Sequence, residues 1–215
     1  MKKVVLVVND LGDLGHSYHS PFSFLGDCSY DMGMLETDPE KIAAVVFTGG
    51  ADISPCVYKQ GKGSRTSINQ KRDLQEMDAF IKAMSNKIPL IGVCRGAQLL
   101  CALTGGSLIQ HVSGHSGTHH DCRLKNGKTL MVNSYHHQMM VPGPDSEILG
   151  WAEPRKSNVY LGAHDQPLDQ PEKEAEIAYF PRHRAIGFQY HPESMCKESD
   201  GFKMCREIIE RYLNI

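Results

Sequence analysis

The pattern of apolar and polar positions predicts strands and helices along the whole chain. Short apolar runs bounded by polar or glycine residues are typical of buried strands, and apolar positions three and four apart are typical of amphipathic helices. The apolar runs predict strands at residues 3–8, 43–48, 88–93, 129–133, 147–152, 176–180 and 185–190. The helical spacing predicts helices at about 71–85, 95–104 and 200–213.

The order of these elements favours an α/β fold. The early part reads strand, strand, helix, strand, helix, which is typical of a mainly parallel central sheet flanked by helices. The later strands follow one another more closely and predict an antiparallel extension of that sheet. Residues 164–174 are polar and contain prolines, which indicates an exposed loop. Because no linker or repeat divides the chain, we expect residues 1–215 to form a single domain.

Composition and charge exclude several classes of protein. Lys and Arg number 23 and Asp and Glu 25, for a net charge of −2, and no basic run suggests a nucleic-acid partner. No apolar run approaches the ~18 residues of a membrane span. The seven cysteines form no CxxC pair, and the N-terminal apolar run is too short for a signal peptide. These features predict a protein of the reducing cytoplasm without disulfide bonds.

Cys94 lies where a predicted strand meets a predicted helix. Gly92 and Gly96 stand two residues away on either side, which is the spacing of a nucleophile elbow. A thiol at a helix N-terminus is favoured as thiolate by the positive end of the helix dipole. Most cysteines of this kind of protein are small buried hydrophobes, but the glycine spacing favours a nucleophile here.

A cysteine nucleophile needs a base and a group that orients the base. His191 follows a predicted strand directly, and Glu193 lies two residues further on, with Pro192 fixing the backbone between them. In isolation these residues are typical of an exposed strand end. Together with Cys94, they predict a triad in which Glu193 orients the imidazole.

An oxyanion site can be expected beside the thiol. Gly49 and Gly50 follow a predicted strand, where backbone N–H groups can approach a ligand closely. The N–H of Arg95, directly after the nucleophile, would be a second donor. Most glycine pairs are merely turns, so this prediction depends on Cys94.

Three motifs taken together resemble the class I glutamine amidotransferase superfamily, and their order and separations fit nearly the whole chain. They are Thr48-Gly49-Gly50-Ala51-Asp52, Gly92-Val93-Cys94-Arg95-Gly96-Ala97-Gln98 and His191-Pro192-Glu193. The resemblance implies a flavodoxin-like single-domain α/β fold, a Cys94–His191–Glu193 triad and acyl transfer through a γ-glutamyl thioester, with no cofactor.

Further segments look like the branch of stand-alone γ-glutamyl hydrolases typified by γ-glutamyl-γ-aminobutyrate hydrolase. The resemblance implies that water cleaves the γ-glutamyl amide of a small molecule, releasing glutamate and an amine. Region 10–42 is shorter and more irregular than in that branch, so the amine is not identified. The segments are Thr48 to Tyr58, Arg72-Asp73-Leu74-Gln75-Glu76, Thr104 to Gln110, and Asn133-Ser134-Tyr135-His136-His137-Gln138.

The resemblance also implies substrate contacts. Gln98 lies one helical turn after Cys94 and is expected near the glutamyl group, with an ordinary surface glutamine as the alternative. His136 and His137 are expected beside the cleft, and one of them to contact substrate. The resemblance also implies a functional role for Arg72 and Glu76. The alternative for these two residues is an ordinary i,i+4 ion pair on a helix surface.

Two other functions stay open. A glutaminase subunit supplying ammonia to a separate synthetase would use the same chemistry at Cys94, although residues 133–138 favour a free-standing hydrolase. A non-catalytic binding module is disfavoured by the apparent triad. The sequence does not decide the oligomeric state, and a homodimer stays open.

The histidines raise the question of a metal site. With Asp121 or Cys122 they could offer ligands, but their spacing matches no tight template such as H-E-x-x-H, and residues 113–120 indicate a polar loop. We therefore expect no metal. Six of the 11 histidines fall within 27 positions: His111, His115, His119, His120, His136 and His137.

Overall fold

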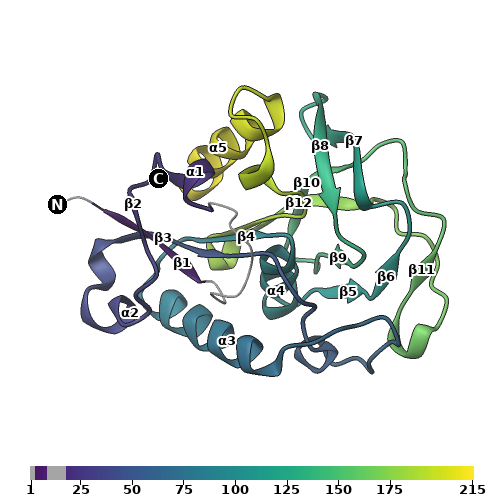
Figure 1. Ribbon diagram of the computed structural model, residues 1–215, viewed down its shortest axis with the longest axis horizontal. Coiled ribbons are helices and arrows are strands. Elements are labelled where there is room, and N and C mark those ends of the chain that lie inside the picture. The colour runs from purple at the N-terminus through teal and green to yellow at the C-terminus, as the bar shows by residue number, and fades with distance from the viewer. Residues whose placement is uncertain (1–2, 9–17) are drawn as a thin grey trace.

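A mixed sheet forms the centre of the molecule (Figure 1). The structure, a computed structural model, describes residues 3–8 and 18–215, and within them eleven strands join one sheet. Its main path is β2-β1-β3-β4-β13-β12-β10-β7-β8, while β9 pairs with both β12 and β5. The strands are β1 (Val4–Val8), β2 (Asp27–Ser29), β3 (Ile42–Phe47), β4 (Leu90–Val93), β5 (Ser107–Ile109), β7 (Ser116–Leu124), β8 (Thr129–Tyr135), β9 (Met139–Val141), β10 (Glu147–Ala152), β12 (Ala175–Phe180) and β13 (Ala185–Phe188). A separate two-stranded sheet pairs β6 (His111–Val112) with β11 (Tyr160–Leu161).

The direction of the strands divides the sheet into two parts. Strand β1 is parallel to β2 and β3, and β4 is parallel to β3 and β13. From β13 onward, the pairs with β12, β10, β7 and β8 are antiparallel. The predicted α/β fold, a mainly parallel central sheet with an antiparallel extension, is confirmed.

Apolar side chains alternate between the two faces of the sheet, as the pleat requires. Val5 and Val7 pack with residues of α5 on one face, whereas Leu6 and Val8 pack with residues of α3 and α4 on the other. Figure 1 shows α5 and α1 on one side of the sheet and α2, α3 and α4 on the opposite side. The helices are α1 (His19–Phe22), α2 (Met34–Thr37), α3 (Gln70–Ser85), α4 (Arg95–Leu103) and α5 (Asp200–Leu213).

The three long predicted helices correspond to α3, α4 and α5, and two of them begin at polar caps. The side chain of Asn69 accepts a hydrogen bond from the backbone of Arg72, and Ser199 accepts one from Phe202. In its described part, the irregular region 10–42 contains α1, β2, α2, a 3-10 turn at Pro39–Lys41 and the first residue of β3. Residues 10–17 lie outside the described residues.

The polar loop predicted at residues 113–120 is wrong in its second half. Residues from Ser116 onward form β7, which pairs antiparallel with β8. His120, Cys122 and Leu124 alternate inward along this strand. The alternation is hidden in the sequence because an inward position is occupied by a histidine rather than an apolar residue.

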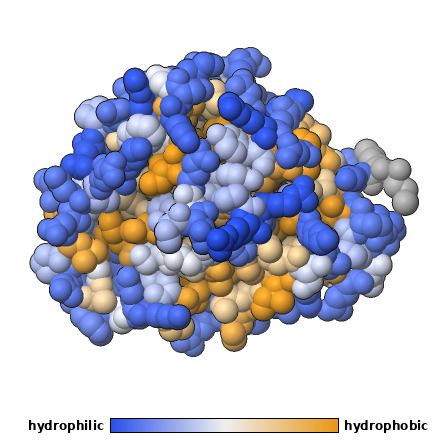
Figure 2. Space-filling model, turned by 180° about the vertical axis from the view of Figure 1, so that it is seen from behind, coloured by the Kyte–Doolittle hydropathy of each residue, from blue (hydrophilic) through white to orange (hydrophobic). Residues whose placement is uncertain are grey.

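Polar and apolar residues are interspersed over the face of the molecule shown in Figure 2. Within the described part of the chain, no helix combines the length and apolar character needed to cross a bilayer. The predicted loop at residues 164–174 is confirmed as the mostly irregular segment that precedes β12.

Candidate active site

Cys94 occupies a strained turn between β4 and α4. Its backbone has φ 51° and ψ −107°, outside the regions that non-glycine residues ordinarily adopt. Its N–H donates to the carbonyl of Phe188 in β13 at 2.7 Å, which anchors the turn to the neighbouring strand. This backbone strain at a strand–helix junction is the geometry of a nucleophile elbow.

The two glycines around Cys94 are required by close backbone approaches. A Cβ atom on Gly92 would lie 2.5 Å from the backbone of Gly96, and one on Gly96 would lie 2.1 Å from the carbonyl oxygen of Phe47. Both distances are shorter than any real carbon contact. The glycines predicted from the sequence therefore let α4 begin directly against β3 and β4.

His191 and Glu193 follow β13, the strand adjacent to β4. Nδ1 of His191 lies 2.6 Å from Oε1 of Glu193, whose side chain is buried. The other edge of the ring hydrogen-bonds the side chain of Cys94. The carboxylate accepts the Nδ1 proton and so turns Nε2 toward the sulfur, the arrangement expected of a thiol–imidazole–carboxylate triad.

The electrostatics of this group favour a charged imidazole. Burial lowers the pKa of His191, but the Cys94 sulfur and the Glu193 carboxylate outweigh burial and raise that pKa to about 11. A charged imidazole beside the sulfur can give its proton to a leaving group.

Asn133, a buried residue of β8, clamps the backbone of His191. Its Oδ1 accepts the His191 N–H at 2.8 Å, and its Nδ2 donates to the His191 carbonyl at 2.9 Å. The ring of Tyr135 meets the His191 ring edge-on, with 5.7 Å between centroids. Sequence reasoning singled out neither residue, although both lie in the quoted segment 133–138.

Gly49 stands next to both Cys94 and His191. A Cβ atom there would lie 3.1 Å from Cε1 of His191 and 3.7 Å from Cβ of Cys94. Its N–H, an expected oxyanion donor, donates to the hydroxyl of Tyr18 at 3.0 Å. Gly50 follows with φ 136°, a conformation that L side chains rarely adopt.

The side chain of Arg95 points away from the thiol, into a buried network of charges. It meets Asp73 at 2.5 Å and also contacts Glu76. Arg72 donates to Glu76 at 2.9 Å and to the carbonyl of Gly49 at 2.8 Å. The surface ion pair considered for Arg72 and Glu76 is therefore wrong, because both side chains are buried. The network connects the Gly49–Gly50 loop and the start of α4 to helix α3.

Gln98 is buried, and its side-chain amide is hydrogen-bonded within the protein. Its Nε2 donates to the carbonyl of Gln138 at 3.1 Å and to Oε1 of Gln189 at 3.3 Å. These contacts tie α4 to the segment after β8 and to the end of β13. An exposed helix-surface glutamine is excluded.

The structure separates His136 from His137. His136 is buried, with Nδ1 2.8 Å from the carbonyl of Gln138. His137 is half-buried, and its Nε2 lies 3.0 Å from Oδ1 of Asp52, a hydrogen bond that raises its pKa. Of the two, His137 is the one a substrate could reach.

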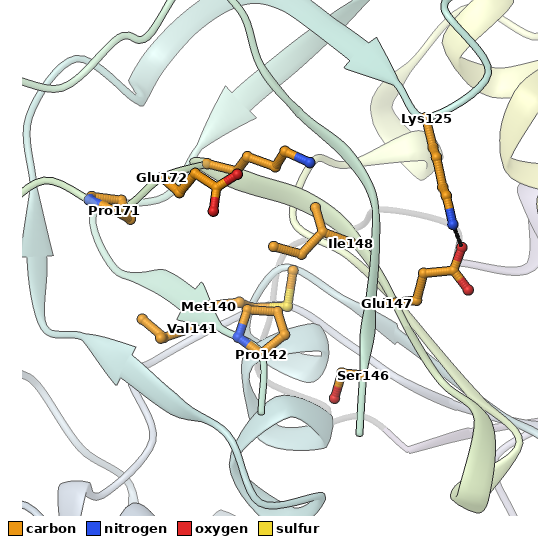
Figure 3. Close-up of a pocket in the computed structure, with 10 residues that line it drawn as sticks. Lys125, Met140, Val141, Pro142, Ser146, Glu147, Ile148, Pro171 and Glu172 are labelled. Carbon is orange, nitrogen blue, oxygen red and sulfur yellow. Dashed lines mark hydrogen bonds and ion pairs between the residues drawn. The ribbon is translucent and has the colours of Figure 1, made fainter. Parts of the chain in front are cut away.

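A cavity of about 560 Å³ lies on the antiparallel side of the sheet (Figure 3). None of Cys94, His191 and Glu193 contributes to its wall. Figure 3 shows Lys125 and Glu147 paired at one side of it, with Met140 and Ile148 at its centre. The lining residues are Lys125, Met140, Val141, Pro142, Ser146, Glu147, Ile148, Pro171, Glu172 and Lys173.

A different group of side chains has the composition of a metal site. Donor atoms of His115, His120, His136 and Glu176, all buried, lie within 4.8 Å of one another. This group is formed by β7, β8, β12 and the residues beside them, and the triad takes no part in it. The sequence-based expectation of no metal does not anticipate this cluster.

Comparisons with known proteins identify the family. The signature of the family described as Peptidase C26 matches residues 30–180, which include Cys94 and end before His191. A gamma-glutamyl-CDP-amidate hydrolase from Campylobacter jejuni subsp. jejuni is 33% identical over 116 residues, covering 54% of this chain and 50% of that protein. The glutamine amidotransferase-like protein YvdE homolog of Lactococcus lactis subsp. cremoris is 33% identical over 117 residues, covering 45% of this chain and 62% of that protein. The chain spans about half the length of the curated relatives it matches.

Solved structures share the fold. PurLQS from Thermotoga maritima aligns with a TM-score of 0.66 at 15% identity, covering 99% of this chain and 100% of that chain. A glutamine amidotransferase from the same organism aligns with a TM-score of 0.61 at 15% identity, covering 100% and 94%. The fold, the elbow cysteine and the family match lead to one conclusion: the chain belongs to the Peptidase C26 family, within the class I glutamine amidotransferase superfamily.

Proposed function

We propose that this chain hydrolyses the γ-glutamyl amide bond of a small molecule, with Cys94 as nucleophile, His191 as general acid and base, and Glu193 orienting His191. The observation that carries the proposal is the strained turn at Cys94 with a hydrogen-bonded His191–Glu193 pair beside it. The Campylobacter relative, named as a hydrolase of a γ-glutamyl amidate, supports the same bond type.

The reaction follows from the charges at the site. The Cys94 thiolate attacks the γ-carbonyl carbon, and the carbonyl oxygen takes up the negative charge. The tetrahedral adduct collapses as the C–N bond breaks, and the His191 imidazolium gives its proton to the leaving amine. Water, deprotonated by His191, then attacks the thioester. Glutamate leaves and the Cys94–His191 pair is restored.

Backbone donors would stabilise the oxyanion. Arg95 is the first residue of α4, so its N–H lies among those that have no partner within the helix. Gly49 N–H is the second donor, and substrate must displace the Tyr18 hydroxyl from it. The buried ion pairs of Arg72 and Arg95 hold both backbone segments in place.

The test is hydrolysis of a panel of γ-glutamyl amides, glutamine included, by the wild type and by Cys94→Ala. We expect turnover by the wild type and a loss of all detectable turnover in the variant, with an unchanged melting temperature. Cys196→Ala, which changes an exposed cysteine outside the Cys94–His191–Glu193 group, is the matched control and should keep full activity.

Two outcomes would contradict the proposal. Full activity in Cys94→Ala would remove the nucleophile. Activity on glutamine alone, stimulated by an added synthetase, would favour the glutaminase subunit. Mass spectrometry of a trapped Cys94 acyl-enzyme would identify the acyl half of the substrate directly. Failure of Cys94 to form any adduct with an electrophilic glutamine analogue would favour a binding module.

A further inference from the structure

Three histidines and a glutamate converge in the interior at the antiparallel side of the sheet. His115 precedes β7, His120 lies on it, His136 follows β8, and Glu176 lies on β12. Each is at most 4% exposed. Charged and titratable side chains are almost never fully buried unless they are paired or bind a metal.

The distances within this cluster match those of a tetrahedral metal site. Oε1 of Glu176 lies 3.4 Å from Nδ1 of His115, 3.1 Å from Nε2 of His120 and 3.4 Å from Nε2 of His136. Zinc binds nitrogen and carboxylate oxygen at about 2.0–2.2 Å, which places tetrahedral ligands about 3.3 Å apart. All four donor atoms lie within 4.8 Å of one another, so small side-chain adjustments close the tetrahedron.

The outward nitrogens of the three rings are held by hydrogen-bond acceptors. Nδ1 of His120 lies 3.1 Å from the carbonyl of Asp121, and Nδ1 of His136 lies 2.8 Å from that of Gln138. A carbonyl only accepts, so each of these nitrogens carries the proton and the Nε2 lone pair of the neutral ring points into the cluster. Metal-binding histidines are oriented in this way by their surroundings.

His115 has the same arrangement with its two nitrogens exchanged. Its Nε2 lies 3.3 Å from Oε2 of Glu174, a buried carboxylate that also accepts from the backbone of Lys156 and Ser157 and from the hydroxyl of Tyr160. In the neutral ring whose Nε2 donates to Glu174, the Nδ1 lone pair of His115 is directed toward Glu176. The nearby Ser134 hydroxyl donates to the His115 carbonyl at 2.6 Å, which engages its proton.

The atoms at the centre of the cluster lack satisfactory partners. Among the residues that the structure describes, no hydrogen bond of good geometry reaches Nε2 of His120, Nε2 of His136 or either carboxylate oxygen of Glu176. Four electron-pair donors thus face one point, an arrangement that is costly to bury unless a cation compensates it.

We propose that His115, His120, His136 and Glu176 bind a divalent transition-metal ion, zinc in the first place, in a closed structural site. Imidazole nitrogen and carboxylate oxygen suit Zn²⁺, and four protein ligands leave no open position for a substrate. Glu174 is the outer carboxylate that orients His115. With three neutral imidazoles, the two carboxylates balance the charge of the ion. This site does not depend on the proposed hydrolase activity.

The ion would join three strands of the antiparallel extension. It would fix the segment directly after β8. In this segment His136 is followed by His137 and by Gln138, whose carbonyl accepts a hydrogen bond from Gln98. A metal here would therefore stabilise the segment that contacts Gln98 of α4 without entering the chemistry at Cys94.

The experiment measures metal content in the intact protein. The purified wild type is analysed for all transition metals, stripped with a chelator and reloaded with Zn²⁺ or Co²⁺. We expect about one ion per chain, the visible absorption of tetrahedral Co²⁺, and a melting temperature that falls on stripping and recovers on reloading. Wild-type protein that takes up no ion after reloading would overturn the proposal.

Matched variants locate the site. His120→Gln is expected to lose the ion, whereas His119→Gln, which changes an exposed neighbour on the same strand, should keep it. Glu174→Gln should weaken zinc affinity about 10- to 100-fold, as expected of an outer-shell change. Cys94→Ala should retain about one ion per chain, which separates this site from zinc on the thiol. If His120→Gln does not fold, the stripping and reloading of the wild type decide the question alone, and equal zinc binding by a folded His120→Gln contradicts the proposal.

Discussion

Replacing Asn133 by alanine tests whether the clamp on the His191 backbone positions the base. The change removes two hydrogen bonds, from His191 N–H at 2.8 Å and to its carbonyl at 2.9 Å, and leaves both backbone groups without their partner. A net contribution of about 1 kcal/mol per hydrogen bond predicts that the free energy of unfolding falls by roughly 2 kcal/mol. Because Asn133 lies on β8 and His191 follows β13, the clamp connects segments 58 residues apart.

At temperatures where the Asn133→Ala variant is folded, the change should appear as a slower reaction of the Cys94 thiol. A base released from its position no longer hydrogen-bonds Cys94 in a fixed geometry, and misplacement of about 1 Å costs about 100-fold in rate. We therefore expect alkylation of Cys94 at neutral pH to slow by about 10- to 100-fold. Peptide mass spectrometry after timed treatment with iodoacetamide measures this rate without knowledge of the substrate.

A matched control separates positioning from general destabilisation. Asn126 accepts one hydrogen bond from the backbone of Lys128 at 3.0 Å in an exposed turn, so Asn126→Ala should leave the alkylation rate unchanged. Asn133→Gln, which keeps the amide but lengthens the side chain, should recover part of the rate. The reasoning is refuted if folded Asn133→Ala alkylates at the wild-type rate.

Two further predictions follow from the electrostatics of the site. Because the pKa of His191 is raised to about 11 in the folded protein, its protonation stabilises the fold fully below its ordinary pKa of about 6.5 and progressively less as pH rises toward 11. Urea unfolding between pH 6 and 10 should show this decline in the free energy of unfolding. A decline with pH as steep in Glu193→Gln as in the wild type would contradict the prediction. Arg95→Met leaves Asp73 without its buried cation and leaves Glu76 paired with Arg72 alone, and should lower the free energy of unfolding by about 3–5 kcal/mol. Arg206→Met, which breaks the exposed pair with Glu210, should lower it by at most about 1 kcal/mol. Equal losses in the two variants would argue against the burial of the network.

The sequence alone identified the parallel part of the sheet and the elbow within it. Runs such as 43–47 and 88–93 show no alternation with polar residues, because strands covered by helices on both faces need no polar side. The glycines around Cys94 are similarly local signals, since they are required by contacts within a few residues or with the adjacent strand. Cys94, His191 and Glu193 were grouped by residue type and then by the resemblance, and the structure places them at the ends of neighbouring strands.

Other residues had roles that no local pattern could predict. Arg72 and Glu76 have the spacing of a surface pair, and only the packing of α3 against the Gly49 loop buries them with Arg95 and Asp73. Gln98 has the right helical phase to face the cleft, yet Gln138 and Gln189 engage its amide. Their partners lie far away in sequence, so hydrophobic periodicity carries no information about them.

The histidines show most clearly which properties the sequence determines and which the tertiary structure decides. Their residue types and their clustering along the chain were visible, but the ligand spacing matched no template and the segment around His115 and His120 read as a loop. The fold decides which of them matter: pairing of β7 with β8 and the position of β12 turn three imidazoles toward Glu176 and leave His119 on the surface. A strand shows alternate residues to opposite faces, so the register of pairing, which is set by long-range contacts, selects which histidines meet in the interior.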